Sequence, residues 1–291
     1  MPSGFGKPAA SRRISSRNLH LVVLGVAIFG FLFTDLVPVY WIALSAFTPR
    51  GELFADKFRY LPLHVSIENF RLVFESIPYG RYFLNSLIVC FSSTLIVSIV
   101  SFLASYPFAR LRFRGRDFVF MLFLASMMLP PMSTVIPLFK LFRDFGLLNT
   151  LGGLILVYSS ALLPFTIWIF TSFFRQVPAE LEDAARIDGA GFGHILLQIV
   201  APLMRPILSS MFIINFISAW NELVWPLIFC TRTDAKLLTV GLTEAATTQS
   251  FYTPWENISA MAVMMIVPVT VLVLVFQRQI MAGLMSGAFK E

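Results

Sequence analysis

The sequence predicts an all-α integral membrane protein with six transmembrane helices, and two observations predict that class. Of the 291 residues, 57% are hydrophobic and only 13% are charged, which is about half the charged share of a soluble domain. A soluble fold cannot accommodate so much apolar surface, because its outside must face water. The second observation is a series of long apolar runs separated by charged connections.

Each of these runs is long enough to form a spanning helix, which needs roughly 20 mostly apolar residues. The predicted spans are 19–46, 84–108, 118–138, 151–174, 206–230 and 259–277. Pro130 and Pro131 predict a kink in the third span, and Pro164 predicts one in the fourth.

The spans also predict how the chain is organised and oriented. They divide it into an N-terminal tail (1–18), a first helix with an external loop (19–83), a core of five helices (84–278) and a C-terminal tail (279–291). Lys and Arg gather in short cytoplasmic connections. Because four arginines lie within 110–116 and four basic residues lie in the N-terminal tail, both termini and the connection 175–205 are predicted to be cytoplasmic. The first apolar run is too long for a signal peptide, so we expect it to remain as a helix.

The connection 175–205 carries the most informative pattern. Pro178 suits the first turn of a helix, and Asp188-Gly189 ends it because glycine tolerates a left-handed exit. The acidic residues that favour a helix N-terminus are Glu180, Glu182 and Asp183. Ala184 and Ala185 leave room for another protein to approach closely. The alternative is an interfacial helix that packs on its own bundle.

The residues of this connection resemble a known motif. Asp183-Ala184-Ala185, Gly189, Ile199 and Pro202 have the spacing of the Glu-Ala-Ala loop found in permease subunits of type I ATP-binding-cassette importers. Two positions depart from the family pattern, since Asp183 stands where Glu is usual and Ala201 where Leu is usual.

The resemblance extends over nearly the whole chain and is closest to carbohydrate permeases of the maltose-transporter kind. The segments that carry it are 38–41, 85–86, 106–115, 136–139, 146–150, 220–222, 225–227, 277–278 and 283–287.

This resemblance implies a type I ABC importer permease fold with a cytoplasmic coupling helix, in the inner membrane of a bacterium. The loop would dock on an ATPase subunit through Glu180, Glu182, Asp183, Ala184, Ala185, Asp188, Gly189, Ile199 and Pro202. The C-terminal tail would contact the ATPases through Gly283, Ser286 and Gly287. The implied partners are a second permease subunit, two ATPase subunits, an extracytoplasmic solute-binding protein and the sugar.

The chain is predicted to hold no cofactor and to catalyse no reaction itself. It lacks the Gly-x-x-x-x-Gly-Lys-Ser/Thr phosphate loop, so ATP and Mg would be bound by the partner ATPases. Its two cysteines lie inside apolar runs, and its three histidines have no metal-ligand spacing. The net charge of +6 is explained by membrane topology, so no nucleic-acid partner is expected.

Polar and aromatic residues of the fifth span are a candidate substrate path, with Asn221 and Glu222 predicted in the outer half of that helix. They are Asn215, Trp220, Asn221 and Glu222. Aromatic rings stack on sugar rings and polar groups meet hydroxyls, whereas the alternative is an aromatic belt at the membrane interface. Asp35, inside the first span, is either a functional carboxylate or a structural group.

Three alternatives to a sugar or oligosaccharide importer remain open from the sequence. The same machine could carry glycerol phosphate or a polyol, although the spans contain no deep basic residue for a phosphate. A proton-coupled carrier would need ionisable groups on its path, and Asp35 is the one candidate. An intramembrane enzyme would need a catalytic constellation, for which the sequence offers no pattern.

Overall fold

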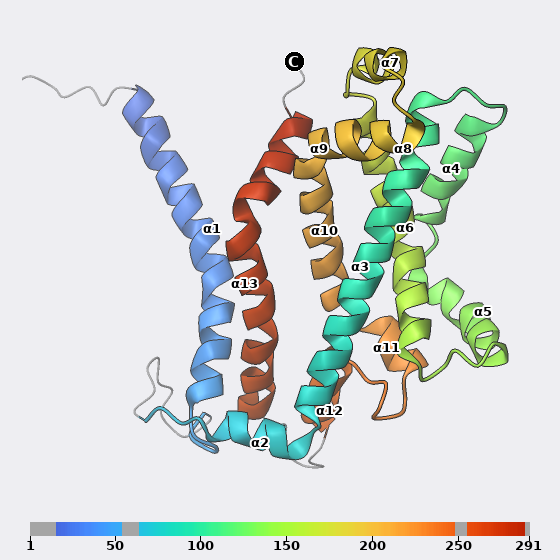
Figure 1. Cartoon of the computed structure of the whole chain (residues 1–291). Coiled ribbons are helices and arrows are strands. Elements are labelled where there is room, and N and C mark those ends of the chain that lie inside the picture. The colour runs from blue at the N-terminus through green and yellow to red at the C-terminus, as the bar shows by residue number, and fades with distance from the viewer. Residues whose placement is uncertain (1–15, 54–63, 248–254, 289–291) are drawn as a thin grey trace, which may run out of the picture.

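A computed structural model describes residues 16–53, 64–247 and 255–288, and every regular element in these ranges is helical. Figure 1 shows long, roughly parallel helices with short helices gathered at both ends. The helices long and apolar enough to cross a membrane are α1 (Ser16–Phe47), α3 (Tyr79–Arg110), α6 (Leu151–Phe174) and α13 (Trp255–Ala288). They correspond to the first, second, fourth and sixth predicted spans, so the all-α membrane fold is confirmed.

The third predicted span is not one kinked helix. It consists of α4 (Arg116–Ser126) and α5 (Pro131–Asp144), which are bent by 98° at the break between them. Pro130 has extended backbone angles (φ −65°, ψ 132°) and Pro131 opens the next helix. A proline ring disfavours helical geometry in the residue before it, so two adjacent prolines end one helix and start another. The two prolines predict a kink at this position, but they do not predict how large the bend is.

The fifth predicted span is also divided. Helix α10 (Arg205–Trp220) ends within the span, and the short helix α11 (Val224–Phe229) follows it. Pro226 has no N–H to donate to the carbonyl of Glu222, which instead accepts hydrogen bonds from Tyr158 and Thr239 (3.4 and 2.9 Å). Asn221 and Glu222 therefore lie in a break between helices, not in the outer half of a continuous helix as predicted.

The centre of the bundle is the contact between α3 and α6. One stripe of α3 repeats every four residues and is fully buried, with Val89, Ser93, Val97, Ser101 and Ser105 along it. Small side chains at this spacing let two helix backbones approach closely in a membrane protein. The hydroxyl of Ser105 also donates to the carbonyl of Ile167 on α6, at 3.1 Å.

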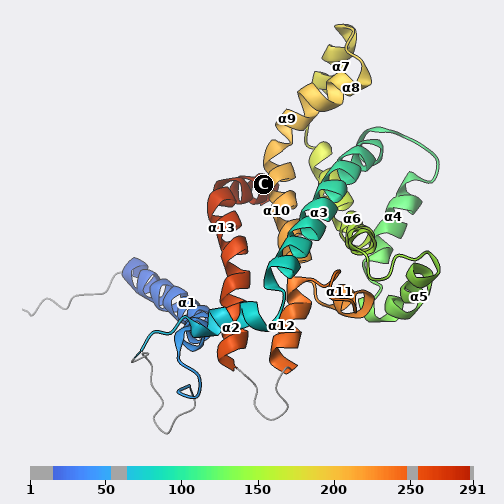
Figure 2. The same ribbon diagram turned by 60° about the horizontal axis from the view of Figure 1, so that its bottom comes forward.

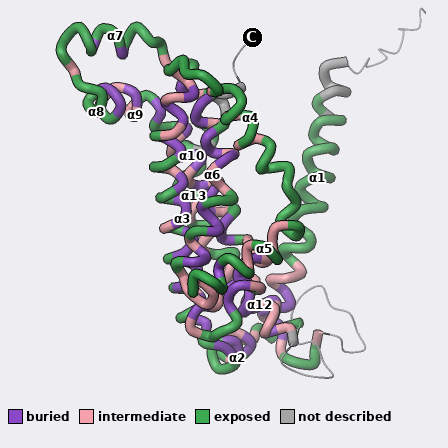
Figure 3. The backbone as a smooth tube through the Cα atoms, turned by 90° about the vertical axis from the view of Figure 1, so that its right-hand side faces the viewer, coloured by how far each residue is buried: buried purple, intermediate pink, exposed green. Residues whose placement is uncertain are grey.

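Helix α1 lies at the side of this bundle. Its residues 23–40 are exposed, and it meets α13 only through its second half, near Val39, Ile42 and Ala43 (Figures 1 and 3). Helix α2 (Glu68–Ser76) crosses the end of α1, where the amide of Asn69 donates to the carbonyls of Ala46 and Thr48 (3.0 and 2.8 Å). Asp35 is exposed on the free part of α1, away from the bundle core.

Candidate coupling site at one end of the bundle

Helix α7 (Ala179–Ile187) stands beyond the end of the bundle (Figures 1 and 2), at the same end as the start of α1 and the end of α13 (Figure 1). Pro178 precedes it with extended backbone (φ −58°, ψ 128°), and Glu180 and Glu182 lie in its first turn. The helix predicted for this connection is therefore present, with the predicted start.

Gly189 ends α7 as its position predicts. Its φ is +83°, and the next residue, Ala190, donates its N–H to the carbonyl of Ala185 at 2.9 Å. A Cβ at position 189 would have no atom within 4 Å. The requirement for glycine here therefore comes from backbone conformation and not from crowding, because L-residues pay a steric penalty at positive φ.

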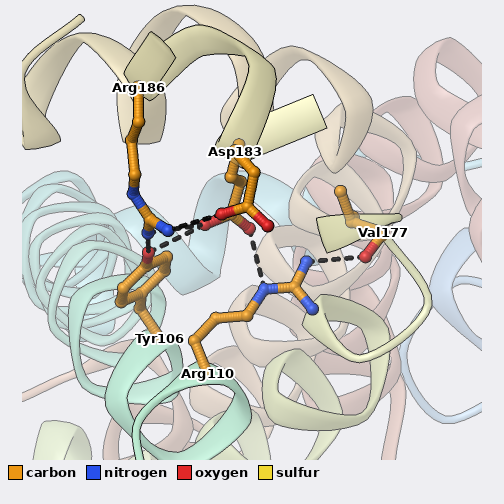
Figure 4. Close-up of polar contacts among 6 residues, drawn as sticks. Tyr106, Arg110, Val177, Asp183 and Arg186 are labelled. Carbon is orange, nitrogen blue, oxygen red and sulfur yellow. Dashed lines mark hydrogen bonds and ion pairs between the residues drawn. The ribbon is translucent and has the colours of Figure 1, made fainter. Parts of the chain in front are cut away.

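The inward face of α7 is fastened by a buried carboxylate. Glu182 is only 2% exposed, and its two oxygens accept hydrogen bonds from Nε of Arg110 (2.7 Å) and from the hydroxyl of Tyr106 (2.8 Å) (Figure 4). Both partners lie in the last turns of α3. Arg110 also donates through Nη2 to the carbonyl of Val177 at 2.6 Å, which ties down the chain just before α7.

Arg186 closes the network on its exposed side. Its Nη1 lies 2.8 Å from Oδ1 of Asp183, and its Nη2 donates to the hydroxyl of Tyr106 at 3.2 Å (Figure 4). The distance from Arg186 Nη2 to Oε2 of Glu182 is 3.7 Å. Asp183, the residue that replaces the usual Glu, is thus exposed and paired within its own helix.

The outward face of α7 is apolar and acidic. Ile187 is 87% exposed and Leu181 is 44% exposed, while Ala184 and Asp188 also face away from the bundle. Leu181 and Ile187 are exposed although they lie outside the helices that could cross a membrane. Ala185, in contrast, is buried among residues of the bundle end, so the two alanines of the motif have different environments.

The chain returns from α7 through one nearly continuous helical arm. It is built of α8 (Phe192–His194), the π-helix η1 (Ile195–Val200) and α9 (Ala201–Leu203), and it meets α10 at an angle of 77°. Ile195, Leu196 and Val200 are buried against Phe102, Tyr106 and Phe174. Ile199 and Pro202 of the motif are partly exposed on this arm. Ala185 and Ile199, from the two ends of the motif, belong to the same apolar cluster.

Tyr106 and Arg110 were not predicted as members of this site. Both lie in the resemblance segment 106–115, and Arg110 is also one of the charges that predict the topology. The sequence does hold a signal, since Glu182 lies three residues before Ala185 and so shares its inward face. A carboxylate on a buried face needs a cationic or hydrogen-bonding partner.

The residues predicted at the C-terminal tail and the substrate path lie elsewhere. Gly283, Ser286 and Gly287 are in the last turns of α13, and their side chains are outside the described residues. Asn215 is buried and donates to Thr166 on α6 at 3.0 Å. Trp220 is 3% exposed, stacks on Phe216 and donates to the carbonyl of Met265.

Of the four substrate-path residues, Asn221 is exposed, while Glu222 uses its carboxylate to accept from the N–H of Val224 at 2.7 Å, at the start of α11. Their role in binding sugar stays a prediction. Within the described residues, no group of three His, Cys, Asp or Glu side chains is placed to hold a metal.

Comparison with known proteins defines the class. Residues 97–284 match the family described as the binding-protein-dependent transport system inner membrane component. The chain belongs to this family, whose members are the membrane-spanning permease subunits of ABC importers.

Particular relatives cover almost the whole chain. It is 36% identical over 255 residues to the diacetylchitobiose uptake system permease protein NgcG of Streptomyces coelicolor, covering 88% of this chain and 84% of that protein. It is 34% identical over 274 residues to the trehalose transport system permease protein SugB of Mycobacterium tuberculosis, covering 94% and 98%. A solved bacterial ABC transporter involved in the import of the acidic polysaccharide alginate has the same fold, with a TM-score of 0.77 and 23% identity over 94% of this chain and 99% of that one.

These findings confirm the resemblance and the predicted fold class. The protein is a membrane-embedded permease subunit, and its relatives are named as permease proteins of uptake and transport systems.

Proposed function

We propose that this chain, with a second permease subunit, forms the translocation pathway of a bacterial sugar importer. We further propose that the segment 178–202 docks on a cytoplasmic ATPase subunit. The relatives named for diacetylchitobiose and trehalose uptake support a sugar or oligosaccharide as substrate. ATP and Mg would be bound by two partner ATPases, and an extracytoplasmic solute-binding protein would deliver the sugar.

The observation that carries the docking proposal is the two-sided character of α7. Its inward face is fixed through Glu182, whereas its outward face presents Leu181, Ala184 and Ile187 beyond the end of the bundle. A helix that merely packed on its own bundle would turn its large apolar side chains inward. A groove on another protein would cover this apolar face, in the way that helix-in-groove recognition generally works.

The arrangement of charge supports a cytoplasmic position for this end. The arginines of 110–116 lie at the same end as α7, and so do the start of α1 and the end of α13 (Figure 1). Short arginine-rich connections are retained on the cytoplasmic side. Both termini would then be cytoplasmic, in a bacterial inner membrane.

ATP hydrolysis by the assembled complex in nanodiscs tests this proposal. The chain is co-expressed with its genomic neighbours, purified through a tag on it, and compared with Gly189→Asp. We expect an ATPase to co-purify with the wild type, and hydrolysis to rise when a solute-binding protein is added with one sugar of a panel that includes trehalose and diacetylchitobiose. Gly189→Asp should lose that stimulation, because aspartate is strained at a φ of +83° and displaces the end of α7.

Gly115→Asp is the matched control. It makes the same substitution at the same backbone conformation, φ +84°, with open space for a Cβ, at the same end of the bundle but outside 178–202, so stimulation should persist. If the wild-type chain purifies without an ATPase, the docking proposal fails. If glycerol phosphate or a polyol stimulates hydrolysis in place of a sugar, the proposal of an ATP-driven importer stands and the proposal of a sugar substrate fails.

A further inference from the structure

The fastening of α7 depends on one buried ion pair. Both carboxylate oxygens of Glu182 are used, one by Arg110 and one by Tyr106, and the side chain is almost fully excluded from solvent. A buried carboxylate is tolerated only when its charge is paired and its lone pairs are satisfied. The geometry therefore gives α7 one preferred position against the end of α3.

Tyr106 and Arg110 also join the end of α3 to the segments before and after α7. The ring of Tyr106 packs edge-on against Phe174 at the end of α6 (5.8 Å) and against Phe192 at the start of α8 (5.1 Å). Arg110, the last residue of α3, holds the carbonyl of Val177 as well as Glu182. Tyr106 and Arg110 therefore link α3 to the chain on both sides of α7.

Helix α3 is suited to carry a displacement away from this point. It has 32 residues and is about 48 Å long at the usual rise per residue. Near its other end, Asn85 donates to the carbonyls of Asp234 and Lys236, and the hydroxyl of Tyr82 donates to Glu244 on α12 (Leu238–Thr247). A rigid link at Arg110 would thus connect α7 with structure at the opposite end of the bundle.

We propose that Glu182 is a positioning residue that locks α7 to α3 through Arg110 and Tyr106, so that the two helices move as one rigid body during the transport cycle. This inference rests on the proposed function, because the movement originates in the docked ATPase. In it Glu182 acts on the chain's own bundle and not on the ATPase groove, unlike the exposed residues of α7. The contact is a discrete packed element of the kind that transmits rigid-body switches.

Distances between paired spin labels test the lock in the assembled complex in nanodiscs. The first pair is Ala179→Cys with Leu111→Cys, both at exposed positions, and reports α7 against the end of α3. The second pair is Ala179→Cys with Met281→Cys and reports α7 against α13. The native cysteines Cys90 and Cys230 are free but buried, so they should not take the label. Each pair is measured without nucleotide and with ATP and vanadate.

In the wild type we expect the first distance to stay constant while the second changes with nucleotide. In Glu182→Gln, the first distance distribution should become roughly twofold broader and should shift with nucleotide, because a helix that has lost its buried ion pair samples more positions. Glu75→Gln is the matched control, since it makes the same substitution in an exposed pair with Arg71, and it should behave as the wild type.

The lock is overturned if the first distance changes with nucleotide as much as the second in the wild type, if neither changes, or if Glu182→Gln is as narrow as the wild type. Tyr106→Phe keeps the ring and the Arg110–Glu182 ion pair but removes the hydrogen bonds of the hydroxyl to Glu182 and Arg186, so a smaller broadening is expected. If Glu182→Gln does not assemble, a Tyr106→Phe distribution as narrow as the wild type overturns the lock. If no ATPase co-purifies, the proposed function fails. The distribution of the first distance, measured in the chain alone, still tests the lock, because it should be narrow in the wild type and broad in Glu182→Gln.

Discussion

Helices α1 and α3 have the same length, 32 residues, and both are apolar enough to span a membrane. One lies at the edge of the bundle and the other at its centre. Helix α3 lies in the centre and buries a stripe that includes Ser93, Ser101 and Ser105. Helix α1 exposes nearly all of its large apolar side chains and meets the bundle near one end (Figure 3).

The difference teaches that hydropathy decides whether a helix enters the bilayer, whereas small side chains decide how closely it packs there. Lipid tails are as apolar as leucine, so apolar surface alone gives no preference for another helix over lipid. The stripe of α3 has this close-packing signature and also supplies a hydrogen bond to α6. Residues 23–39 of α1 are exposed and belong to neither buried cluster.

Filling the stripe of α3 should have the largest effect. Ser105→Leu adds a large side chain where none fits and removes the hydrogen bond to Ile167, so we expect a loss of about 3 kcal/mol of stability. Thermal unfolding in detergent measures it. Gly30→Leu on α1 is the control, because a Cβ there meets no atom within 4 Å. An equal loss in both variants would show that α3 is not packed more closely than α1.

Close approach at the start of α6 should matter almost as much. A Cβ at Gly153 would lie 2.3 Å from the carbonyl oxygen of Leu147, whereas one at Gly152 would have open space. We expect Gly153→Ala to cost about 2 kcal/mol through strain, and Gly152→Ala to be neutral or slightly stabilising. The same unfolding assay compares the two neighbours, and similar midpoints would contradict the tight packing at position 153.

Loosening the end of α1 from α2 should cost less, because the second half of α1 also packs against α13. Asn69→Ala removes the donor to the carbonyls of Ala46 and Thr48, and we expect a local loss of about 1 kcal/mol. Faster tryptic cleavage at the exposed Arg50, with little change in the unfolding midpoint, is the expected result. Glu75→Ala on the exposed side of α2 is the control. A large drop in the midpoint would mean that α1 is integral to the core.

The smallest effect is expected from Asp35→Asn. Asp35 is exposed on the free part of α1 and lies outside the buried clusters, so transport should be unchanged. Sugar uptake by the assembled complex in proteoliposomes measures this, with and without ATP on the ATPase side and with and without an imposed pH gradient. Loss of uptake in the variant, or uptake driven by the gradient without ATP, would favour a proton-coupled carrier.

The sequence by itself determined the class of the fold, the number of apolar segments and the helix at 179–187. Each depends on local properties, namely segment length against bilayer thickness, proline at a helix start and glycine at its end. The sequence also revealed the motif that pointed to the family, because residue types and their spacing can be recognised without knowing which residues are in contact.

Only the tertiary structure decided what each helix touches. Pro130 and Pro131 mark a break in the third span, but its size, 98°, comes only from the structure. At the break after Asn221, distant residues satisfy the carbonyl of Glu222. The partners of Glu182 lie 72 and 76 residues away in sequence, so no local pattern links them. A buried charge demands a partner, but the packing of α3 against the end of α6 selects which one, because contact between distant segments is a property of the folded chain.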